Sequence, residues 1–545
     1  SDVCSSDLHE LNKLRIPYHV TSGNHETKWS ESGCTDFGRV FGSDRFEFIH
    51  KGVYFIGFNS GPVIKMSDGH VAPQDIQWLR DNLHDKSQSD KVRYIIPITH
   101  YPLQTGDVDN WFEVTDILRQ YNVQCVIGGH YHRNLLLNCD GIPDVLCRSN
   151  LRGKSAVGGY TIIRMDTDSL RFYEKVIGEK ATQWVSLPVG DVSYPAADAT
   201  LRPDYSCNTA YPRIRHRWQQ SLGKGIYAAP AVDKQRIFIG DDAGNFYCLK
   251  LSNGKVLWCQ KTGNRIISTA AIEGRSVVVG STDGSIYCYD TRTGEQRWRY
   301  QTAKAVMGCP VIADGIVYIG GSDSCFYALN LDDGSEKWTF RGVGGYVETR
   351  PCIYDGRLYF GAWDCYFYCL NKADGTLVWK WTNGMKSDKY SPAAVWPVAA
   401  NGRIYITAPD RVFTALDAKT GEVVWRTKQH VVRETIGISK DNKMVFSRCM
   451  WDSIVAMDAT TDKPVTLWKT NGAYGYDHNP SMLVEKDGVI VFGTKNGLLL
   501  GVDAKNGNVI WRHKLSNCVL NTIYPISGRK SIVSSSNGTV TYVVR

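Results

Sequence analysis

CPVIADGIVYIGGSDSCFYALNLDDGSEKW, residues 309–338, is the stretch of sequence that decides the fold of the second half of the chain. Short runs in which apolar and polar residues alternate are separated by turns rich in Asp and Gly. Alternation with a period of two indicates β-strands, and turns of this kind join antiparallel strands. The stretch therefore predicts part of an antiparallel sheet, with four strands in each repeat.

The same sequence pattern recurs through residues 213–545. A second copy, TAAIEGRSVVVGSTDGSIYCYDTRTGEQRW, occupies residues 269–298, and the tryptophans that end the copies stand 40 to 46 residues apart. About 40 residues for four strands is the size of one blade of a β-propeller. The tryptophans that mark the repeats are Trp218, Trp258, Trp298, Trp338, Trp379, Trp425, Trp468 and Trp511.

The two ends of this region indicate how the propeller closes. Its last residues, NGTVTYVVR at 537–545, stop three strands into a blade, whereas RIRHRWQQ at 213–220 supplies a single strand that contains Trp218. Pairing that N-terminal strand with the C-terminal strands would leave no open sheet edge. We therefore expect an all-β propeller of seven complete blades and one composite blade, eight in all.

Composition and charge exclude some classes of protein. The net charge of +8 is spread along the chain, without a dense run of Lys and Arg, so we expect no nucleic-acid partner. No apolar stretch reaches the roughly 18 residues that a membrane span needs, which predicts a soluble chain. The first eight residues, SDVCSSDL, lack Met, and we interpret 1–8 as a non-native leader that replaces the native start.

The repeats resemble the pyrroloquinoline-quinone-type propeller repeat of outer-membrane assembly lipoproteins and of quinone-dependent alcohol dehydrogenases. Those dehydrogenases carry an adjacent pair of cysteines beside the quinone. This sequence has neither a Cys-Cys pair nor a Cys-x-x-Cys-His haem attachment signature. We therefore expect no pyrroloquinoline quinone (PQQ) cofactor, since a shared fold does not imply a shared function.

Several of the 16 cysteines occupy one position of the repeat. Cys248, Cys288 and Cys369 stand where other repeats have Ala328 and Ala415. A position that accepts Cys or Ala requires a small buried apolar group, so we expect these thiols to fill the core. Cys139 and Cys147 flank a predicted turn, and a disulfide between them is an alternative that spacing alone leaves open.

Residues 9–187 show a different sequence pattern, in which runs typical of strands alternate with runs typical of helices. Residues 75–83 place Ile76, Leu79 and Leu83 on one helical face, and residues 114–121 predict a second helix. Predicted strands cover a short run near 18–20, residues 92–100 and residues 123–132. This alternation is typical of an α/β domain, in which functional sites form beyond the carboxyl ends of the strands.

Polar side chains gather where these predicted strands end. Asn24 and His25 follow the first, His100 ends the second, and His130 and His132 end the third. Imidazoles delivered by several strands to one rim favour a metal site over isolated structural histidines. Gly23, Gly128 and Gly129 permit tight turns and close approach of the backbone to a bound ion or phosphate.

Three motifs at these positions, GNHE at 23–26, THYP at 99–102 and GHYH at 129–132, resemble the last three sequence blocks of the calcineurin-like metallophosphoesterases. The resemblance implies an α/β sandwich over residues 9–187. It implies that Asn24, His100 and His130 bind one metal and that His132 binds the other.

By the same resemblance, His25 would protonate the leaving group or steady the transferred phosphoryl group. Glu26 would orient that imidazole. Two divalent ions of the iron, manganese or zinc class would share a hydroxide that attacks phosphorus.

Two further blocks of that family, Asp-x-His and Gly-Asp-x-x-Asp, should precede GNHE and supply the carboxylate that bridges the two metals. They are not found upstream of Gly23. Asp107 in TGDVDN follows His100, the wrong order for such a block, and we interpret it as a loop residue. We therefore expect this chain to be a truncated form of an active parent, with an incomplete sandwich and impaired activity.

Residues 188–212 are rich in Pro, Ser, Ala and Asp and predict a linker to the propeller at 213–545. The sequence thus predicts a metal-dependent phosphoester hydrolase whose propeller binds a substrate or a partner. Its substrate would be a phosphoester small molecule or a phosphoprotein, and the propeller ligand a protein or a glycan. By resemblance, its location is extracytoplasmic, in the periplasm or secreted. The alternatives are a non-catalytic scaffold of the cell envelope and, third, a quinone oxidoreductase.

Overall fold

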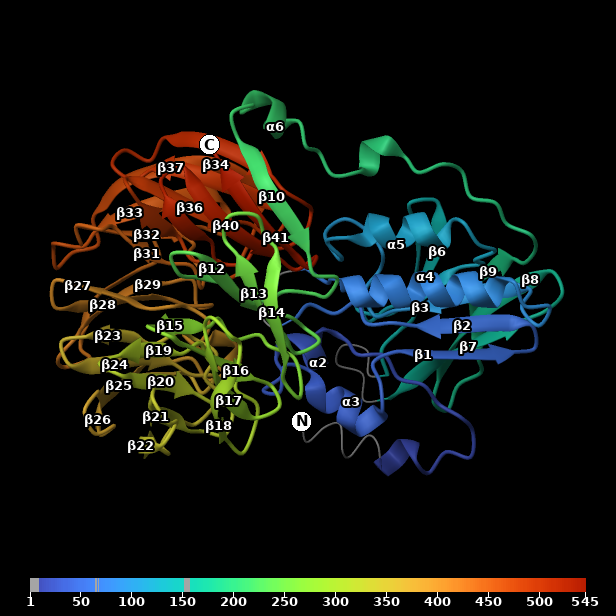
Figure 1. The fold of residues 1–545 in the computed structure, drawn as a ribbon. Coiled ribbons are helices and arrows are strands. Elements are labelled where there is room, and N and C mark those ends of the chain that lie inside the picture. The colour runs from blue at the N-terminus through green and yellow to red at the C-terminus, as the bar shows by residue number, and fades with distance from the viewer. Residues whose placement is uncertain (1–8, 64–65, 67, 151–156) are drawn as a thin grey trace. The chain divides into compact units, whose positions relative to one another are not determined.

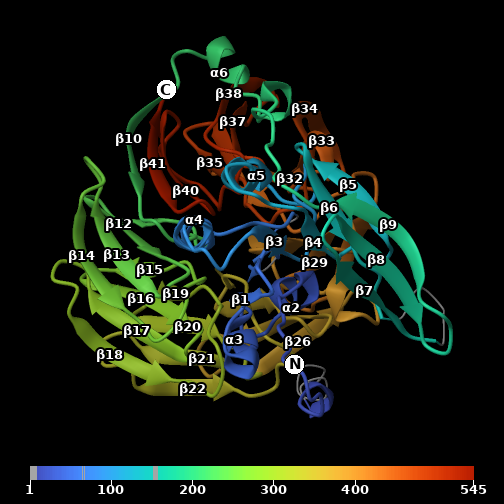
Figure 2. The same cartoon turned by 90° about the vertical axis from the view of Figure 1, so that its right-hand side faces the viewer.

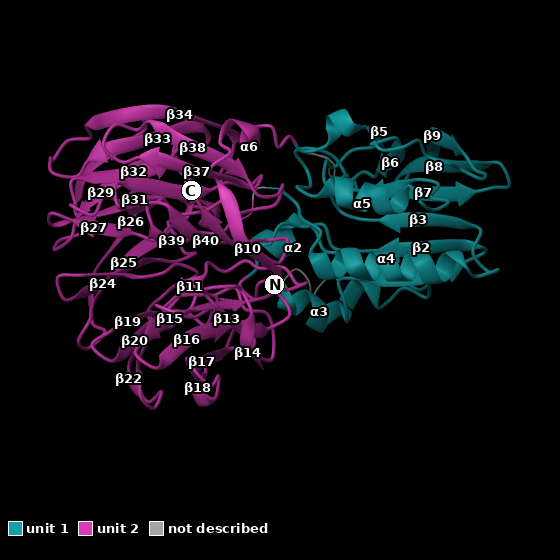
Figure 3. Ribbon diagram, turned by 45° about the horizontal axis from the view of Figure 1, so that its top comes forward, with its two compact units in different colours: residues 1–30, 34–64, 68–203 teal, residues 31–33, 65–67, 204–545 magenta. Residues whose placement is uncertain are grey.

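The computed structural model describes residues 9–63, 66, 68–150 and 157–545. The chain divides into two compact units, which Figure 3 colours separately. The boundary lies between Pro203 and Asp204, inside the segment predicted as a linker, although the short stretch 31–33 clusters with the second unit. Among the residues that the structure describes, no helix has both the length and the apolar composition required to cross a membrane.

The first unit contains a six-stranded mixed sheet in the order β1-β2-β3-β4-β6-β5 and a three-stranded antiparallel sheet, β7-β8-β9. In the larger sheet, β2, β3, β4 and β6 run parallel, and the two edge strands are antiparallel to their neighbours. The bounds of the elements are α2 (Asn24–Lys28), α3 (Thr35–Phe41), β1 (Phe46–His50), β2 (Val53–Gly57), α4 (Pro73–Ser87), β3 (Tyr94–Ile98), α5 (Trp111–Leu118), β4 (Val126–Gly128), β5 (Leu135–Cys139), β6 (Ile142–Leu146), β7 (Gly159–Met165), β8 (Ser169–Val176), β9 (Thr182–Pro188) and the 3-10 helix η1 (Ala199–Leu201).

The six-stranded sheet is covered on both faces, which explains why its parallel strands are mostly apolar, although β6 contains the buried Asp144. On one face, Leu79 and Leu83 of α4 and Val114 of α5 pack against the sheet and are fully buried. On the other, Leu170 and Phe172 of β8 form a second core with the sheet. These layers, visible in Figure 2, agree with the predicted α/β sandwich and with both predicted helices.

One predicted strand is wrong. The run near residues 18–20 forms no strand, and Asn24 instead begins the short helix α2. The His19 ring stacks on the rings of Phe46 and Phe48, at centroid distances of 4.9 and 4.5 Å, and the Thr21 hydroxyl donates to Phe58 O. Ring stacking and side-chain hydrogen bonds, among them one from the Tyr18 hydroxyl to Asn12, therefore hold this segment in place of a backbone ladder.

The segment predicted as a linker is in part anchored to the first unit. The Tyr194 hydroxyl donates to Val123 O at 2.7 Å, and the Gly190 amide donates to the side chain of Gln124. The Arg202 guanidinium pairs with both Asp116 and Asp140. These contacts explain why the boundary between the units lies after Pro203.

The second unit is built almost entirely from four-stranded antiparallel sheets, one for each predicted repeat (Figure 1). The sheets are β10 (Arg215–Ser221) with β41 (Thr539–Val544), β40 (Lys530–Ser535) and β39 (Tyr524–Ser527); β11 (Ala231–Val232), β12 (Arg236–Gly240), β13 (Asn245–Lys250) and β14 (Val256–Lys261); β15 (Ala271–Glu273), β16 (Ser276–Ser281), β17 (Ser285–Asp290) and β18 (Gln296–Gln301); β19 (Val311–Ala313), β20 (Ile316–Gly320), β21 (Phe326–Asn330) and β22 (Glu336–Phe340); β23 (Cys352–Tyr354), β24 (Arg357–Gly361), β25 (Tyr366–Asn371) and β26 (Leu377–Thr382); β27 (Val398–Ala400), β28 (Arg403–Thr407), β29 (Phe413–Asp417) and β30 (Val423–Thr427); β31 (Gly437–Ile438), β32 (Met444–Arg448), β33 (Trp451–Asp458) and β34 (Thr466–Tyr476); and β35 (Val484–Lys486), β36 (Val489–Gly493), β37 (Leu498–Asp503) and β38 (Val509–Lys514). Two short helices, α6 (Cys207–Ala210) and η2 (Asp388–Tyr390), lie outside these sheets.

Six of the eight recurring tryptophans join their sheet to the next. The Trp298 indole Nε1 donates to Leu331 O at 2.7 Å, and its ring covers Gly334, where a Cβ would lie 2.7 Å from a ring carbon. Gly334 has a φ of +74°, which explains why the turn uses glycine. The same tryptophan-on-glycine contact is made by Trp218 on Gly254, Trp258 on Gly294, Trp338 on Gly375, Trp379 on Gly421 and Trp468 on Gly507.

The first strand of the repeat region pairs with the last strand of the chain. β10 is hydrogen-bonded to β41 in an antiparallel register that joins Ser221 to Thr539 and Arg215 to Val544. A core cluster also joins Ile237 and Leu249 of one sheet to Ile532 and Tyr542 of the sheet that contains both ends.

The cysteines at the recurring position fill the core, as predicted. Cys248, Cys288 and Cys369 are fully buried, like the alanines that replace them in other repeats. Cys139 and Cys147 are free thiols, so the alternative of a disulfide between them is wrong.

Candidate metal centre

Three of the predicted metal ligands lie together at the carboxyl edge of the six-stranded sheet. His100 follows β3, His130 follows β4, and Asn24 begins α2. The Asn24 Oδ1 atom is 3.0 Å from His100 Nε2, and His130 Nδ1 is 3.3 Å from the same nitrogen. One amide oxygen and two imidazole nitrogens, which are separated by 76 and 30 residues in sequence, thus converge.

The spacing of these donors fits a shared cation. Imidazole nitrogens and side-chain oxygens bind divalent metals at about 2.0–2.2 Å, so two ligands at right angles stand about 3 Å apart. Imidazole with an amide oxygen suits the borderline ions of the iron, manganese and zinc class. The donor set present at this edge of the sheet therefore fits a metal of that class.

The electrostatic environment keeps the imidazoles neutral. Burial, together with neighbouring imidazoles led by that of His130, lowers the pKa of His100 to about 4. Burial also lowers the pKa of His130, against the opposing effect of the Asp107 carboxylate. Neutral imidazole is the form that presents a lone pair to a metal.

The backbone around the histidines is fitted closely to them. His130 and His132 have φ values of +61° and +59°, a region that costs a non-glycine residue about 1–3 kcal/mol. A Cβ on Gly23 would lie 2.8 Å from the His100 ring, which explains the glycine that opens GNHE. Such strained residues are held in place by their surroundings, and they cluster at functional sites.

A buried acid supports the turn that carries His130 and His132. The Tyr131 hydroxyl, between these two histidines, donates to Asp107 Oδ2 at 2.7 Å, and the Gln104 amide donates to the same oxygen at 2.8 Å. Asp107 is almost fully buried. From the sequence, Asp107 was interpreted only as a loop residue. Its support for the turn depends on the contact with Tyr131, which is 24 residues away in the chain, and sequence spacing does not reveal such a contact.

Tyr131→Phe should weaken divalent-metal binding by roughly tenfold, within the 10–100-fold range typical of residues that hold metal ligands in place. The substitution removes only the hydroxyl that fixes the turn to Asp107, and leaves both histidines present. Titration with Mn²⁺ measures the effect, with Tyr160→Phe on exposed β7 as the matched control. Equal affinities in the two variants would show that the contact with Asp107 does not position the turn.

The other predicted site residues lie nearby. His25 and His132 are exposed, and both act electrostatically on His100 and His130. The Glu26 carboxylate accepts a hydrogen bond from the Gly23 amide at 2.9 Å and thereby fixes the start of α2. Within the described ranges, Glu26 and His25 form no hydrogen bond with each other, so the role seen for Glu26 is support of the helix that begins with Asn24.

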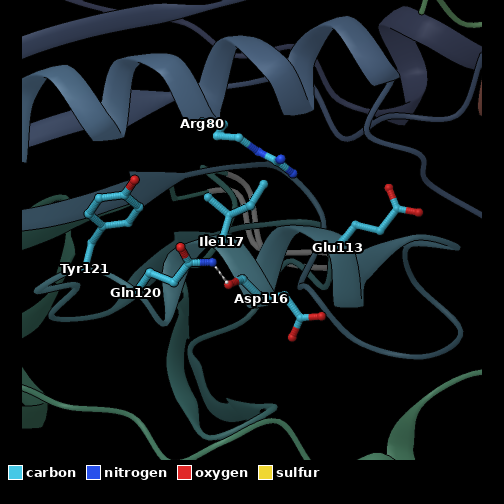
Figure 4. Close-up of a pocket in the computed structure, with 6 residues that line it drawn as sticks. All are labelled: Arg80, Glu113, Asp116, Ile117, Gln120 and Tyr121. Atoms are coloured by element: carbon cyan, nitrogen blue, oxygen red, sulfur yellow. Dashed lines mark hydrogen bonds between the residues drawn. The ribbon is translucent and has the colours of Figure 1, made fainter.

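A separate cavity of about 350 Å³ lies between α4 and α5. Arg80 of α4 and Glu113 of α5 line it, and Figure 4 shows Gln120 donating to the backbone of Asp116. Burial raises the pKa of Glu113. None of the predicted site residues lines this cavity.

Comparison with protein families assigns both units. A family model described as outer membrane protein assembly factor BamB matches residues 215–274, 262–362, 348–449 and 451–543, more than half of the chain. The chain belongs to the BamB propeller family. A second model, calcineurin-like phosphoesterase, matches residues 2–134, so the first unit of this BamB-type chain is a calcineurin-like phosphoesterase domain. Phosphoesterases of that class generally use a dinuclear metal centre.

Curated relatives match the first unit. The serine/threonine-protein phosphatase CPPED1 of Bos taurus is 30% identical over 140 residues, which are 22% of this chain and 42% of that protein. The uncharacterized protein YvnB of Bacillus subtilis is 32% identical over 161 residues, 26% of this chain and 12% of that protein. The chain therefore spans less than half of the length of either relative.

Solved structures match the propeller. BamB from Moraxella catarrhalis superposes with a TM-score of 0.51 at 17% identity, covering 61% of this chain and 98% of that one. A quinohemoprotein alcohol dehydrogenase from Pseudomonas putida gives a TM-score of 0.52 at 13% identity, covering 61% and 76%. At these identities the likeness concerns the fold alone.

Proposed function

We propose that the first unit is a metal-dependent phosphoester hydrolase whose metal is held by Asn24, His100 and His130. The convergence of these three donors within 3.0–3.3 Å at the carboxyl edge of a mostly parallel sheet carries the proposal. His132, the next exposed imidazole along the same turn, would hold the second metal. The match to the phosphoesterase family and to the phosphatase CPPED1 supports the assignment.

The residues of this chain have distinct parts in that chemistry. When bound, the metal pair would lower the pKa of a water molecule and neutralise charge on the phosphoryl group. Asn24, His100 and His130 present neutral donors on a rigid rim, and the turn fixed by Tyr131 and Asp107 holds His130 there. A bridge between two cations needs a carboxylate in addition to these three donors.

His25 is the proton donor in this proposal. Its imidazole is exposed, next in sequence to the ligand Asn24, and near enough to influence the pKa of both His100 and His130. An imidazole in this position can give a proton to the leaving oxygen of the ester. Gly23 and Glu26, which fix the first turn of α2, would hold His25 at the rim.

The propeller would close as eight blades and bind a protein or a glycan. The pairing of β10 with β41, and the core shared by the first and last sheets, support closure. The substrate would be a small phosphoester or a phosphoprotein, the latter supported by the name of CPPED1. The BamB-like fold supports an extracytoplasmic location.

Hydrolysis of p-nitrophenyl phosphate with added Mn²⁺ should fall by roughly 10²–10³-fold in His130→Ala, the usual cost of removing a preorganised stabilising group. His84→Ala, which removes an exposed imidazole from α4 of the same unit, is the control and should keep full activity. If the two variants are equally active, the hydrolase assignment at this rim is wrong.

A further inference from the structure

A cationic pocket lies in the second unit, where the sheet that joins both ends of the chain meets the next one. It has a volume of about 570 Å³, within the range of small-molecule sites. Arg217 of β10, Arg236 of β12 and Lys250 of β13 line it, with Lys234 and with Arg292 from the neighbouring sheet. Figure 1 shows β10, β41, β12 and β13 side by side.

Most of this positive charge has no internal partner. Arg236 pairs with Asp233 at 3.0 Å, but the other four cations of the pocket form no ion pair with any carboxylate in the described part of the chain. No Asp or Glu lines the pocket. Like charges gathered in one concavity raise the local concentration of anions and repel one another until an anion binds.

Lys250 departs from the residue type that stands at the same place in most other repeats. The corresponding residue in five of them is Asp or Asn, and its side chain accepts a hydrogen bond from the amide two residues on. Lysine has no acceptor and cannot make that bond. The residues that make it are Asp290, Asn371, Asp417, Asp458 and Asp503.

The residue paired with Lys250 on the neighbouring strand is also exceptional. Lys250 lies directly opposite Arg236, whereas the arginine at the same place in another sheet, Arg403, lies opposite Asp417. Like charges directly across an antiparallel pair are destabilising. This sheet therefore lacks both the turn hydrogen bond and the favourable charge pair found in other repeats. Local losses of stability of this kind are found at functional sites.

Arg217 reaches the pocket through a bulge. The register of β10 with β41 shifts between His216 and Trp218, so Arg217 is the extra residue of the bulge that all eight sheets have before the tryptophan. Its guanidinium lies over the Tyr542 ring, 5.4 Å from the centroid. Stacking on a ring holds a guanidinium while leaving its N–H groups able to bind an anion in a bidentate manner.

We propose that this pocket binds a compact anion that carries two or more phosphate or sulfate groups. The cluster of cations without carboxylate partners, the Lys250 exception and the stacking of Arg217 on Tyr542 all favour such a ligand. The inference concerns the propeller and does not depend on the hydrolase activity of the first unit. The phosphate groups could belong to a free molecule or to the headgroup of a lipid.

Calorimetric titration with sodium tripolyphosphate, at low salt and with EDTA present to remove metal from the first unit, tests the proposal. We expect saturable binding that Lys234→Gln/Lys250→Gln weakens about tenfold or more, because hydrogen bonds to charged groups are strong. Lys337→Gln/Lys505→Gln removes the same charge from exposed positions elsewhere and should keep the affinity within about twofold. No saturable binding, or equal loss in both double variants, would overturn the proposal.

Lys250→Asp provides a second test, in which thermal stability should increase while anion binding is lost. Introducing the Asp that four other repeats use should raise the Tm by about 2 °C while abolishing tripolyphosphate binding, since stability and function oppose each other at such a site. Retained binding in this variant would overturn the proposal.

Vesicles of phosphatidylcholine with cardiolipin, whose headgroup carries two phosphate groups, distinguish the source of the phosphate. Binding to both vesicles and tripolyphosphate supports the pocket with a lipid headgroup as its ligand, and binding to tripolyphosphate alone supports a free ligand. Binding to vesicles alone would overturn the proposal and assign these cations to a membrane surface.

Discussion

Replacing His100 by alanine should weaken binding of Mn²⁺ or Zn²⁺ by more than roughly 100-fold, beyond the 10–100-fold cost of losing a residue that merely supports a ligand. His100 Nε2 is the atom that both other donors approach, at 3.0 Å from Asn24 Oδ1 and 3.3 Å from His130 Nδ1. Without the His100 imidazole, only Asn24 and His130 remain as donors, and the nitrogen that lies between them is lost. The loss should therefore exceed that in Tyr131→Phe, which keeps all three.

Equilibrium dialysis with each metal measures this effect, and circular dichroism shows whether the variant remains folded. His84→Ala on α4 is again the control, because it removes an exposed imidazole that could bind metal weakly elsewhere on the same unit. Unchanged affinity in a folded His100→Ala protein would mean that the three side chains meet for structural reasons.

Trp298→Ala should destabilise the propeller by about 3–5 kcal/mol, the usual cost of truncating a buried tryptophan. The side chain is 7% exposed, donates to Leu331 O and covers Gly334 of the following sheet. Trp298→Phe keeps most of the buried apolar area but loses the hydrogen bond, so it should cost less, with about 1 kcal/mol due to that bond.

Urea denaturation followed by circular dichroism measures both variants. Trp451→Ala, in which the replaced ring is 62% exposed, is the control and should change the free energy of unfolding by less than about 1 kcal/mol. If Trp298→Ala costs no more than this control, the tryptophan contacts do not hold successive sheets together.

The propeller could be predicted from the sequence because the residues that connect successive sheets recur at the spacing of one blade. A tryptophan and a turn glycine recur about 40 residues apart, and six of the eight tryptophans meet the glycine of the following repeat. The sequence displays both residues but not the contact between them. It also does not reveal that the indole nitrogens of Trp425 and Trp511 have no hydrogen-bond partner in the described residues.

The candidate site was predictable to the extent that strands deliver its residues. His100 and His130 follow β3 and β4, two adjacent parallel strands, whose carboxyl ends must meet at one edge. The segment before Asn24 was predicted wrongly, because its short apolar run mimics a strand while the His19 ring stacks on the rings of Phe46 and Phe48. Asp107 was missed because its role depends on the fold of a loop.

X-ray diffraction with anomalous scattering from a crystal soaked in Mn²⁺ or Zn²⁺ tests the central claim most directly. The account predicts an anomalous peak about 2.0–2.2 Å from His100 Nε2, His130 Nδ1 and Asn24 Oδ1. Saturating metal that gives no peak at this rim, or a peak only at other residues, would contradict it.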